Sequence, residues 1–164
     1  MTKGGDVGDT LRIEVDHPGS AVGSPLVAAQ WRELLVRYGV GESHPDATDD
    51  LEVDHLAPPD GVFLVGWIGD APVACGGVRH RDLLTGEVKR MYVEPGHRGR
   101  GHSRTLLLAL EDHARGLGYS RLVLETGTAQ PEAMALYESE GYARIPGYGF
   151  YGDAPHVRCY AKDL

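Results

Sequence analysis

The residues best suited to bind a charged ligand lie in one short segment, 98–103, which reads Arg-Gly-Arg-Gly-His-Ser and joins a strand-like run to a helix-like run. A helix N-terminus presents unpaired N–H groups and a partial positive charge, which favour an anion. The glycines let an anion approach the backbone, and Arg98, Arg100 and Arg104 would supply mobile positive charge. The segment predicts a phosphate site, although glycine-rich basic loops also connect elements that bind nothing.

Two familiar phosphate motifs are missing from this segment. There is no Gly-x-x-x-x-Gly-Lys-Ser/Thr, which a P-loop nucleoside triphosphatase would carry. The glycines also lack the Gly-x-Gly-x-x-Gly spacing and the following acid of a dinucleotide-binding fold. The expected anion therefore belongs to another class of ligand.

Two longer segments resemble the GNAT acetyltransferases. Residues 91–103 read Met-Tyr-Val-Glu-Pro-Gly-His-Arg-Gly-Arg-Gly-His-Ser, and the family carries Gln/Arg-x-x-Gly-x-Gly/Ala after such a strand and proline. Residues 130–142 read Gln-Pro-Glu-Ala-Met-Ala-Leu-Tyr-Glu-Ser-Glu-Gly-Tyr, which is similar to the family's Asn-x-x-Ala-x-x-Leu-Tyr-x-x-x-Gly-Phe. Ser103 departs from Gly or Ala but is small, so we expect the site to be kept. The resemblance covers 11–164 in architecture and 87–142 in motif detail.

This resemblance implies acetyl-CoA as co-substrate. The strand ending at Val93 would part from the strand 122–126, with the pantetheine arm in the gap and the pyrophosphate on N–H groups from Arg98 to Ser103. No His-Glu-x-x-His or Cys/His ligand set is present, so we expect no metal. The expected cofactor-binding residues are Met91, Tyr92, Val93, Arg98, Gly99, Arg100, Gly101, His102, Ser103, Gln130, Ala133 and Tyr137.

The same resemblance assigns two catalytic roles. An ammonium group with a pKa of about 10.4 must lose a proton before it attacks a thioester. Glu87 is the predicted base, directly or through water, and the alternative is a strand acid that faces solvent. Tyr137 is the predicted acid for the departing thiolate, and the alternative is a core tyrosine. Cys75 and Cys159 each lie in an apolar, strand-like run and are expected to be small core residues, and direct transfer in this family needs neither of them.

The elements that must position these residues follow from hydrophobic periodicity and turn residues. We expect one α/β domain over 11–164 after a flexible tail at 1–10. Its mixed, mainly antiparallel sheet would have splayed central strands and helices on both faces. Expected strands cover about 11–15, 61–68, 71–80, 86–93, 122–126, 142–147 and 156–162. Expected helices cover about 24–38, 46–56, 102–117 and 131–140, with Ser24 as the first N-cap.

Charge and composition limit the partners. The chain has a net charge of −8, and its first 60 residues hold 12 acids against four bases. Residues 89–104 form a small basic region, which suits a compact anion better than a nucleic acid. No apolar run is long enough for a membrane, and two cysteines make no disulfide framework, so we expect a cytoplasmic protein.

The acceptor is less constrained. The expectation is a primary amine on a small molecule, and the acids of 33–60 would favour a cationic acceptor unless they are only a solvated face. A protein or peptide N-acetyltransferase and a non-catalytic acyl-CoA-binding module remain alternatives. The aromatic segment 148–151 could be a lid over the acceptor, a homodimer contact or packing.

Overall fold

Seven strands form one sheet in the computed structural model, which describes residues 10–40, 53–149 and 152–164. The strand order is β1-β2-β3-β4-β5-β7-β6, and every neighbouring pair is antiparallel except β4 and β5. This mixed sheet confirms the predicted fold class. In chain order the described elements are β1 (Arg12–Asp16), α1 (Gly23–Tyr38), the 3-10 turn η3 (Val53–Leu56), β2 (Val62–Ile68), β3 (Ala71–Asp82), β4 (Thr85–Val93), the 3-10 turn η4 (Pro95–His97), α2 (His102–Gly116), β5 (Arg121–Gly127), α3 (Pro131–Ser139), β6 (Ala143–Ile145) and β7 (Val157–Asp163).

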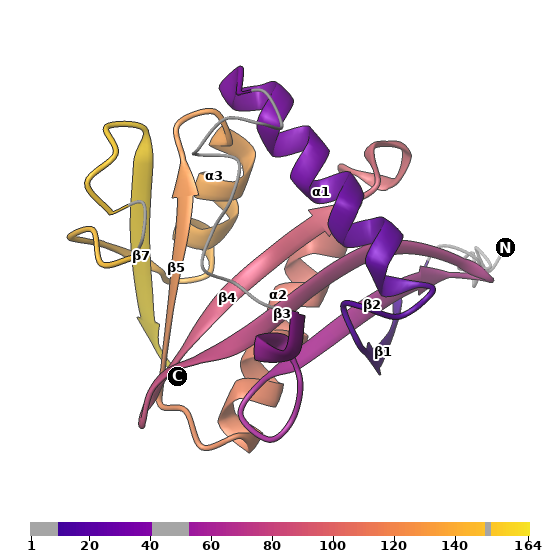
Figure 1. The fold of residues 1–164 in the computed structure, drawn as a ribbon, viewed down its shortest axis with the longest axis horizontal. Helices are drawn as coiled ribbons and strands as arrows, with labels where there is room; N and C mark the ends of the chain where they lie inside the picture. The colour runs from indigo at the N-terminus through magenta and orange to yellow at the C-terminus, as the bar shows by residue number, and fades with distance from the viewer. Residues whose placement is uncertain (1–9, 41–52, 150–151) are drawn as a thin grey trace, which may run out of the picture.

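Helices cover both faces of the sheet. Successive strand residues point to opposite faces, so each strand can contribute side chains to a core on either side. In β2, Leu64 joins the core beneath α2, whereas its neighbours Phe63 and Val65 pack with Leu26 of α1 on the other side. Figure 1 shows α1 crossing the near face while α2 lies behind the strands. The two cores fix the sheet between the helices.

The central strands β4 and β5 part along their length. Their parallel pairing runs only from Thr85↔Arg121 to Val88↔Leu124. Beyond this point β4 stays paired with β3 through a bulge, since the register shifts between Cys75 and Gly77. Bulges increase local twist, and Figure 1 shows β4 and β5 diverging toward their C-terminal ends.

Several predicted boundaries differ from the structure. The first helix begins at Gly23, and Ser24 lies in its first turn instead of capping it. The hydroxyl of Ser20 accepts the Gly23 N–H at 2.8 Å, a bond that local sequence alone did not indicate. Of the helix expected over 46–56, only the turn η3 falls within the described residues, and the tail expected at 1–10 lies almost wholly outside them. No described helix has the length and apolar character to span a membrane.

The packing of α2 on the sheet can be tested with two neighbouring leucines. Leu107 is 0% exposed and Leu108 is 42% exposed. Leu107→Ala should cost about 2–5 kcal/mol of unfolding free energy, because it leaves a cavity in the core. Leu108→Ala should cost less than about 1 kcal/mol, because the methyl groups it removes are largely in water. Urea unfolding measures both, and equal costs would contradict the orientation of the helix.

Candidate active site

Two clefts open where β4 and β5 part, and Met91, Gln130 and Tyr137 line both of them. We name them the β5 cleft and the glycine-loop cleft. The β5 cleft is lined by Gln30, Trp31, Leu34, Leu35, Tyr38, Val40, Val88, Lys89, Arg90, Met91, Glu125, Thr126, Gln130, Tyr137, His156 and Val157. The glycine-loop cleft is lined by Glu33, Arg37, Met91, Tyr92, Val93, His97, Arg98, Gly99, Gly101, His102, Ser103, Gln130, Glu132, Ala133, Leu136 and Tyr137.

The glycine-loop cleft has the backbone geometry expected of an anion site. Gly99 and Gly101 have φ of 74° and 82°, and a Cβ on either would meet no atom within 4 Å. Gly101 is the N-cap of α2, and the first helical bond runs from the Thr105 N–H to its carbonyl at 3.1 Å. The N–H groups of the first turn therefore have no partner inside the helix.

Two buried ring nitrogens add to this environment. Nδ1 of His97 and Nε2 of His102 are buried and have no hydrogen-bond partner within the described part of the chain. A buried polar atom without a partner is costly, and an oxygen-rich ligand would satisfy either nitrogen when it carries a proton. The residues present fit the diphosphate of a coenzyme A molecule.

Two of the three arginines predicted to supply mobile charge, Arg98 and Arg104, are instead held in ion pairs. The Arg98 guanidinium pairs with Glu33 of α1 at 2.8 and 3.0 Å, and its Nε donates to the Val93 carbonyl at 2.7 Å. Arg104 pairs with Glu140 and donates to Ser139 Oγ. The Arg98 N–H also bonds the Pro95 carbonyl at 3.3 Å, so the unpaired amides begin after this residue.

The structure brings the predicted ligand-binding residues together with one exception. All of them line the glycine-loop cleft apart from Arg100, which is exposed. The sequence reasoning missed Glu33 and Arg37 of α1, and Arg37 itself pairs with Glu132 at the start of α3. Their contribution depends on how α1 crosses the sheet, and no motif near either residue indicates it.

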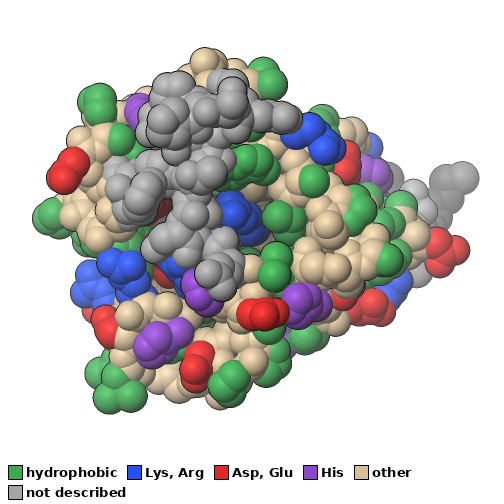
Figure 2. All heavy atoms as spheres, viewed as in Figure 1, with side chains coloured by type: hydrophobic (Ala, Val, Ile, Leu, Met, Phe, Trp, Pro, Cys, Tyr) green, Lys and Arg blue, Asp and Glu red, His purple; other side chains and the backbone are tan. Residues whose placement is uncertain are grey.

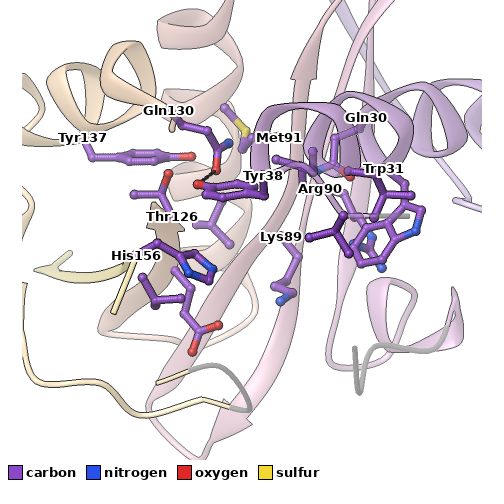
Figure 3. Close-up of a pocket in the computed structure, with 16 residues that line it drawn as sticks. Gln30, Trp31, Tyr38, Lys89, Arg90, Met91, Thr126, Gln130, Tyr137 and His156 are labelled. Carbon is purple, nitrogen blue, oxygen red and sulfur yellow. Dashed lines mark hydrogen bonds between the residues drawn. The ribbon is translucent and has the colours of Figure 1, made fainter. Parts of the chain in front are cut away.

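In the β5 cleft, hydroxyl groups gather beside Tyr137. Figure 3 shows the hydroxyls of Tyr137, Tyr38 and Thr126 pointing into the same part of the cleft. Tyr38 donates to Gln130 Oε1 at 3.0 Å, whereas Thr126 Oγ1 is buried with no partner among the described residues. Burial raises the pKa of the Tyr137 phenol well above its ordinary value, so this group stays protonated at neutral pH.

Charged side chains of both signs line the β5 cleft. Lys89 and Arg90 come from β4, and Glu125 comes from β5. Arg90 has a φ of 62°, unusual for a residue with a side chain, and its guanidinium lies 5.2 Å from the centre of the Trp31 ring. Basic side chains are visible in the hollow of this face in Figure 2.

The acids of 33–60 give little support to the predicted preference for a cationic acceptor. Among the described acids of 33–60, Glu33 lines a cleft, and it is engaged with Arg98. The acids between 42 and 52 lie outside the described residues.

Glu87, the predicted base, is held by two partners away from the clefts. It is 1% exposed, its Oε1 accepts from Arg79 Nε at 2.6 Å, and its Oε2 accepts from the Tyr148 hydroxyl at 2.6 Å. It is not among the residues that line either cleft. Tyr148 thus packs onto the sheet, and the other aromatic residues of its segment, Phe150 and Tyr151, lie outside the described residues.

Both cysteines are buried, as predicted. Cys75 is 0% exposed, and burial raises the pKa of its thiol to about 12. Burial also raises the pKa of Cys159, which lies on β7 opposite Glu125. Such thiols are poor nucleophiles because the thiolate is the reactive form.

Comparison with known proteins agrees with this geometry. The sequence profile of the acetyltransferase (GNAT) family matches residues 28–142. An IAA acetyltransferase of Azospirillum brasilense is 41% identical over 136 residues, which cover 80% of this chain and 88% of that protein. A Klebsiella pneumoniae protein assigned to the acyl-CoA N-acyltransferases has a solved structure with a TM-score of 0.78 and 30% identity, covering 95% of this chain and 99% of that one. A GNAT family acetyltransferase from Elizabethkingia anophelis, solved with acetyl-CoA bound, has a TM-score of 0.67 and 16% identity over 95% of this chain and 99% of that one.

The environment of Glu125 predicts a pH-dependent stability. Burial, the largest cause, raises the pKa of its carboxyl, and the charge of Lys89 opposes the change. The folded chain then keeps this proton to a higher pH than the unfolded chain, so stability falls as pH rises from the ordinary pKa of glutamate through the raised one.

Glu125→Gln removes this titration without changing the shape of the side chain. The melting temperature of the variant, relative to wild type, should rise as pH increases through that interval. Thermal unfolding at a series of pH values measures the difference. A difference that does not change with pH would contradict the raised pKa.

Proposed function

Because the chain belongs to the acetyltransferase (GNAT) family, we propose that it transfers the acetyl group of acetyl-CoA directly to a primary amine of a small molecule. One observation carries this proposal: the glycine-loop cleft and the β5 cleft meet at Met91, Gln130 and Tyr137. A donor held on one side and an acceptor held on the other would bring their reacting atoms to these shared residues. Acetyl-CoA in a protein of the same fold supports this choice of donor.

The glycine-loop cleft would hold the donor. The first-turn amides of α2 and the turn at Gly99 would bind the diphosphate, with His97 and His102 beside it. Acetyl-CoA, when bound, supplies the thioester carbonyl that an amine attacks. The Val93 carbonyl is already bonded to Arg98, so the other backbone groups of Met91 to Val93 are the better candidates to hold the pantetheine arm.

The β5 cleft would hold the acceptor. Trp31, Leu34 and Tyr38 of α1 form one wall, and His156 lies opposite on the segment before β7. A cleft with side walls suits a small molecule better than a peptide, which needs an extended groove. The Tyr137 phenol would give its proton to the departing sulfur, because its raised pKa keeps it in the protonated form.

The activity is tested by thiol release from acetyl-CoA across a library of primary amines. A hit among small amines, with the acetylated amine identified by mass spectrometry, would support the proposal. Release only with peptide acceptors would replace the small-molecule assignment. Tight binding of coenzyme A with no release for any amine would indicate a binding module.

The donor site is tested by Gly101→Val, with Gly118→Val as the matched control. Both glycines have positive φ, and a Cβ on either meets no atom within 4 Å, so the backbone strain is similar. Gly118 follows α2 at its far end and lines neither cleft. Calorimetry should show that only Gly101→Val abolishes binding of coenzyme A, because the new side chain occupies the anion site. Equal affinities of the two variants would exclude this site.

The role of Tyr137 is tested by Tyr137→Phe, with Tyr142→Phe as the control. The two rings pack edge to face at 5.7 Å, but Tyr142 bonds Glu111 and lines neither cleft. Tyr137→Phe should lower kcat roughly 100-fold or more with unchanged affinity for acetyl-CoA, since only the acid is lost. Tyr142→Phe should keep most of the turnover. A wild-type rate in Tyr137→Phe would show that sulfur takes its proton elsewhere.

A further inference from the structure

We propose that Glu125, and not Glu87, receives the ammonium group of the acceptor and takes its proton. This inference rests on the proposed function and adds a residue to it. Glu125 is the first residue of β5 beyond the last β4–β5 pair, Val88↔Leu124. Its carboxylate therefore stands where the two strands begin to part, and it lines the β5 cleft together with Tyr137.

One carboxylate oxygen of Glu125 is poorly satisfied by the protein, with the Gly149 backbone beside it. Its Oε1 is buried and has no hydrogen-bond partner of normal geometry among the described residues. Gly149 lies against it, so closely that a Cβ at that glycine would be 1.9 Å from Oε1. A buried carboxylate oxygen without a donor is costly. An ammonium group entering the cleft would supply both the donor and the opposite charge.

Glu87, in contrast, has a side-chain hydrogen-bond partner on each of its oxygens. Arg79 and Tyr148 each bond one oxygen, and Glu87 is buried and lines neither cleft, so an amine in the β5 cleft would not meet it. Glu87 instead acts on Glu125 through space. It pairs with Val123, two residues before Glu125 on the same face of β5, and its negative charge helps to raise the pKa of Glu125. Glu87 is therefore a positioning residue.

The groups around Glu125 set how strong a base it is. Burial and Glu87 raise its pKa, while Lys89 of β4, Arg81 of β3 and the Gly149 backbone lower it. Tyr148 and Cys159 lie on the same side, with His156 at the edge of the cleft. A carboxylate with a raised pKa is a better proton acceptor than an exposed one.

The proton balance of the reaction is then complete. The ammonium gives one proton to Glu125, which later releases it to solvent. The neutral nitrogen forms a bond to the thioester carbon, and the carbon–sulfur bond breaks. Sulfur takes the Tyr137 phenol proton, and the second proton leaving nitrogen restores the phenol. An ammonium ion and an acetyl thioester give an amide, a thiol and one released proton.

The test compares the pH dependence of kcat/KM in four variants, using acetyl-CoA and the primary amine that the thiol-release screen identifies. Glu125→Gln should lose the acidic limb of the profile and lower kcat/KM for the amine roughly 10² to 10⁴-fold. Its affinity for coenzyme A should not change, because Glu125 does not line the glycine-loop cleft. Retention of the wild-type rate and acidic limb would overturn the proposal.

The other three variants distinguish the role of Glu125 from the roles of its neighbours. Glu87→Gln should keep the acidic limb and move it to lower pH, because a negative charge near Glu125 is lost. Since this change leaves Arg79 buried without its anion and could unfold the chain, Tyr148→Phe removes only the hydrogen bond to Glu87 and should also keep the limb. His156→Asn should keep it too. Loss of the limb in any of these three folded variants would overturn the proposal.

A separate readout does not depend on turnover. Carboxyl-carbon NMR of glutamate-labelled protein, compared with Glu125→Gln, identifies the Glu125 resonance and its titration. Saturating the protein with the screened amine should lower the pKa of Glu125, because the ammonium favours the charged carboxylate. No shift would overturn the contact. A wild-type protein that binds coenzyme A but acetylates no amine would instead refute the proposed function.

Discussion

The parting of β4 from β5 is the constraint on which the rest of the site depends. Parallel pairing holds the strands together only up to Val88 and Leu124, and the bulge at Arg90 and Met91 turns β4 away beyond it. Gly76 makes room for the bulge, because a Cβ there would lie 2.7 Å from Met91 Sδ. Without this divergence the backbone groups of β4 would be used in the sheet, and the two clefts would have no common edge.

Ion pairs between distant elements hold the glycine-loop cleft in shape. Glu33 of α1 binds Arg98, Arg37 binds Glu132 of α3, and Arg104 of α2 binds Glu140. Two of the bases that the sequence concentrates near the loop, Arg98 and Arg104, are thus used to tie the loop and α2 to other parts of the chain. The amides of the first turn of α2 and the imidazoles beside them are left for an anion, which is a fixed arrangement and needs no reordering of long side chains.

The fold and the glycine-loop cleft could be predicted because their signals are local. The segments 91–103 and 130–142 supply most of the residues that line the glycine-loop cleft, and strand and helix patterns located nearly every described element. The β5 cleft could not be predicted from the sequence, because α1 reaches it only through tertiary packing. The family resemblance predicts Glu87 as the base from its place in the strand, and only the structure shows its two partners. One signal was available for Glu125: it is the single acid in the apolar strand run at 122–126.

Backbone amide exchange with and without coenzyme A tests the central claim most directly, because it reports where the ligand meets the chain. The account predicts slower exchange at residues 91–93, beside the parted strands, and at 99–104, around the start of α2, with little change at the far end of this helix. Protection confined to other segments, or none at saturating coenzyme A, would contradict the claim that the divergence of β4 and β5 creates the donor site.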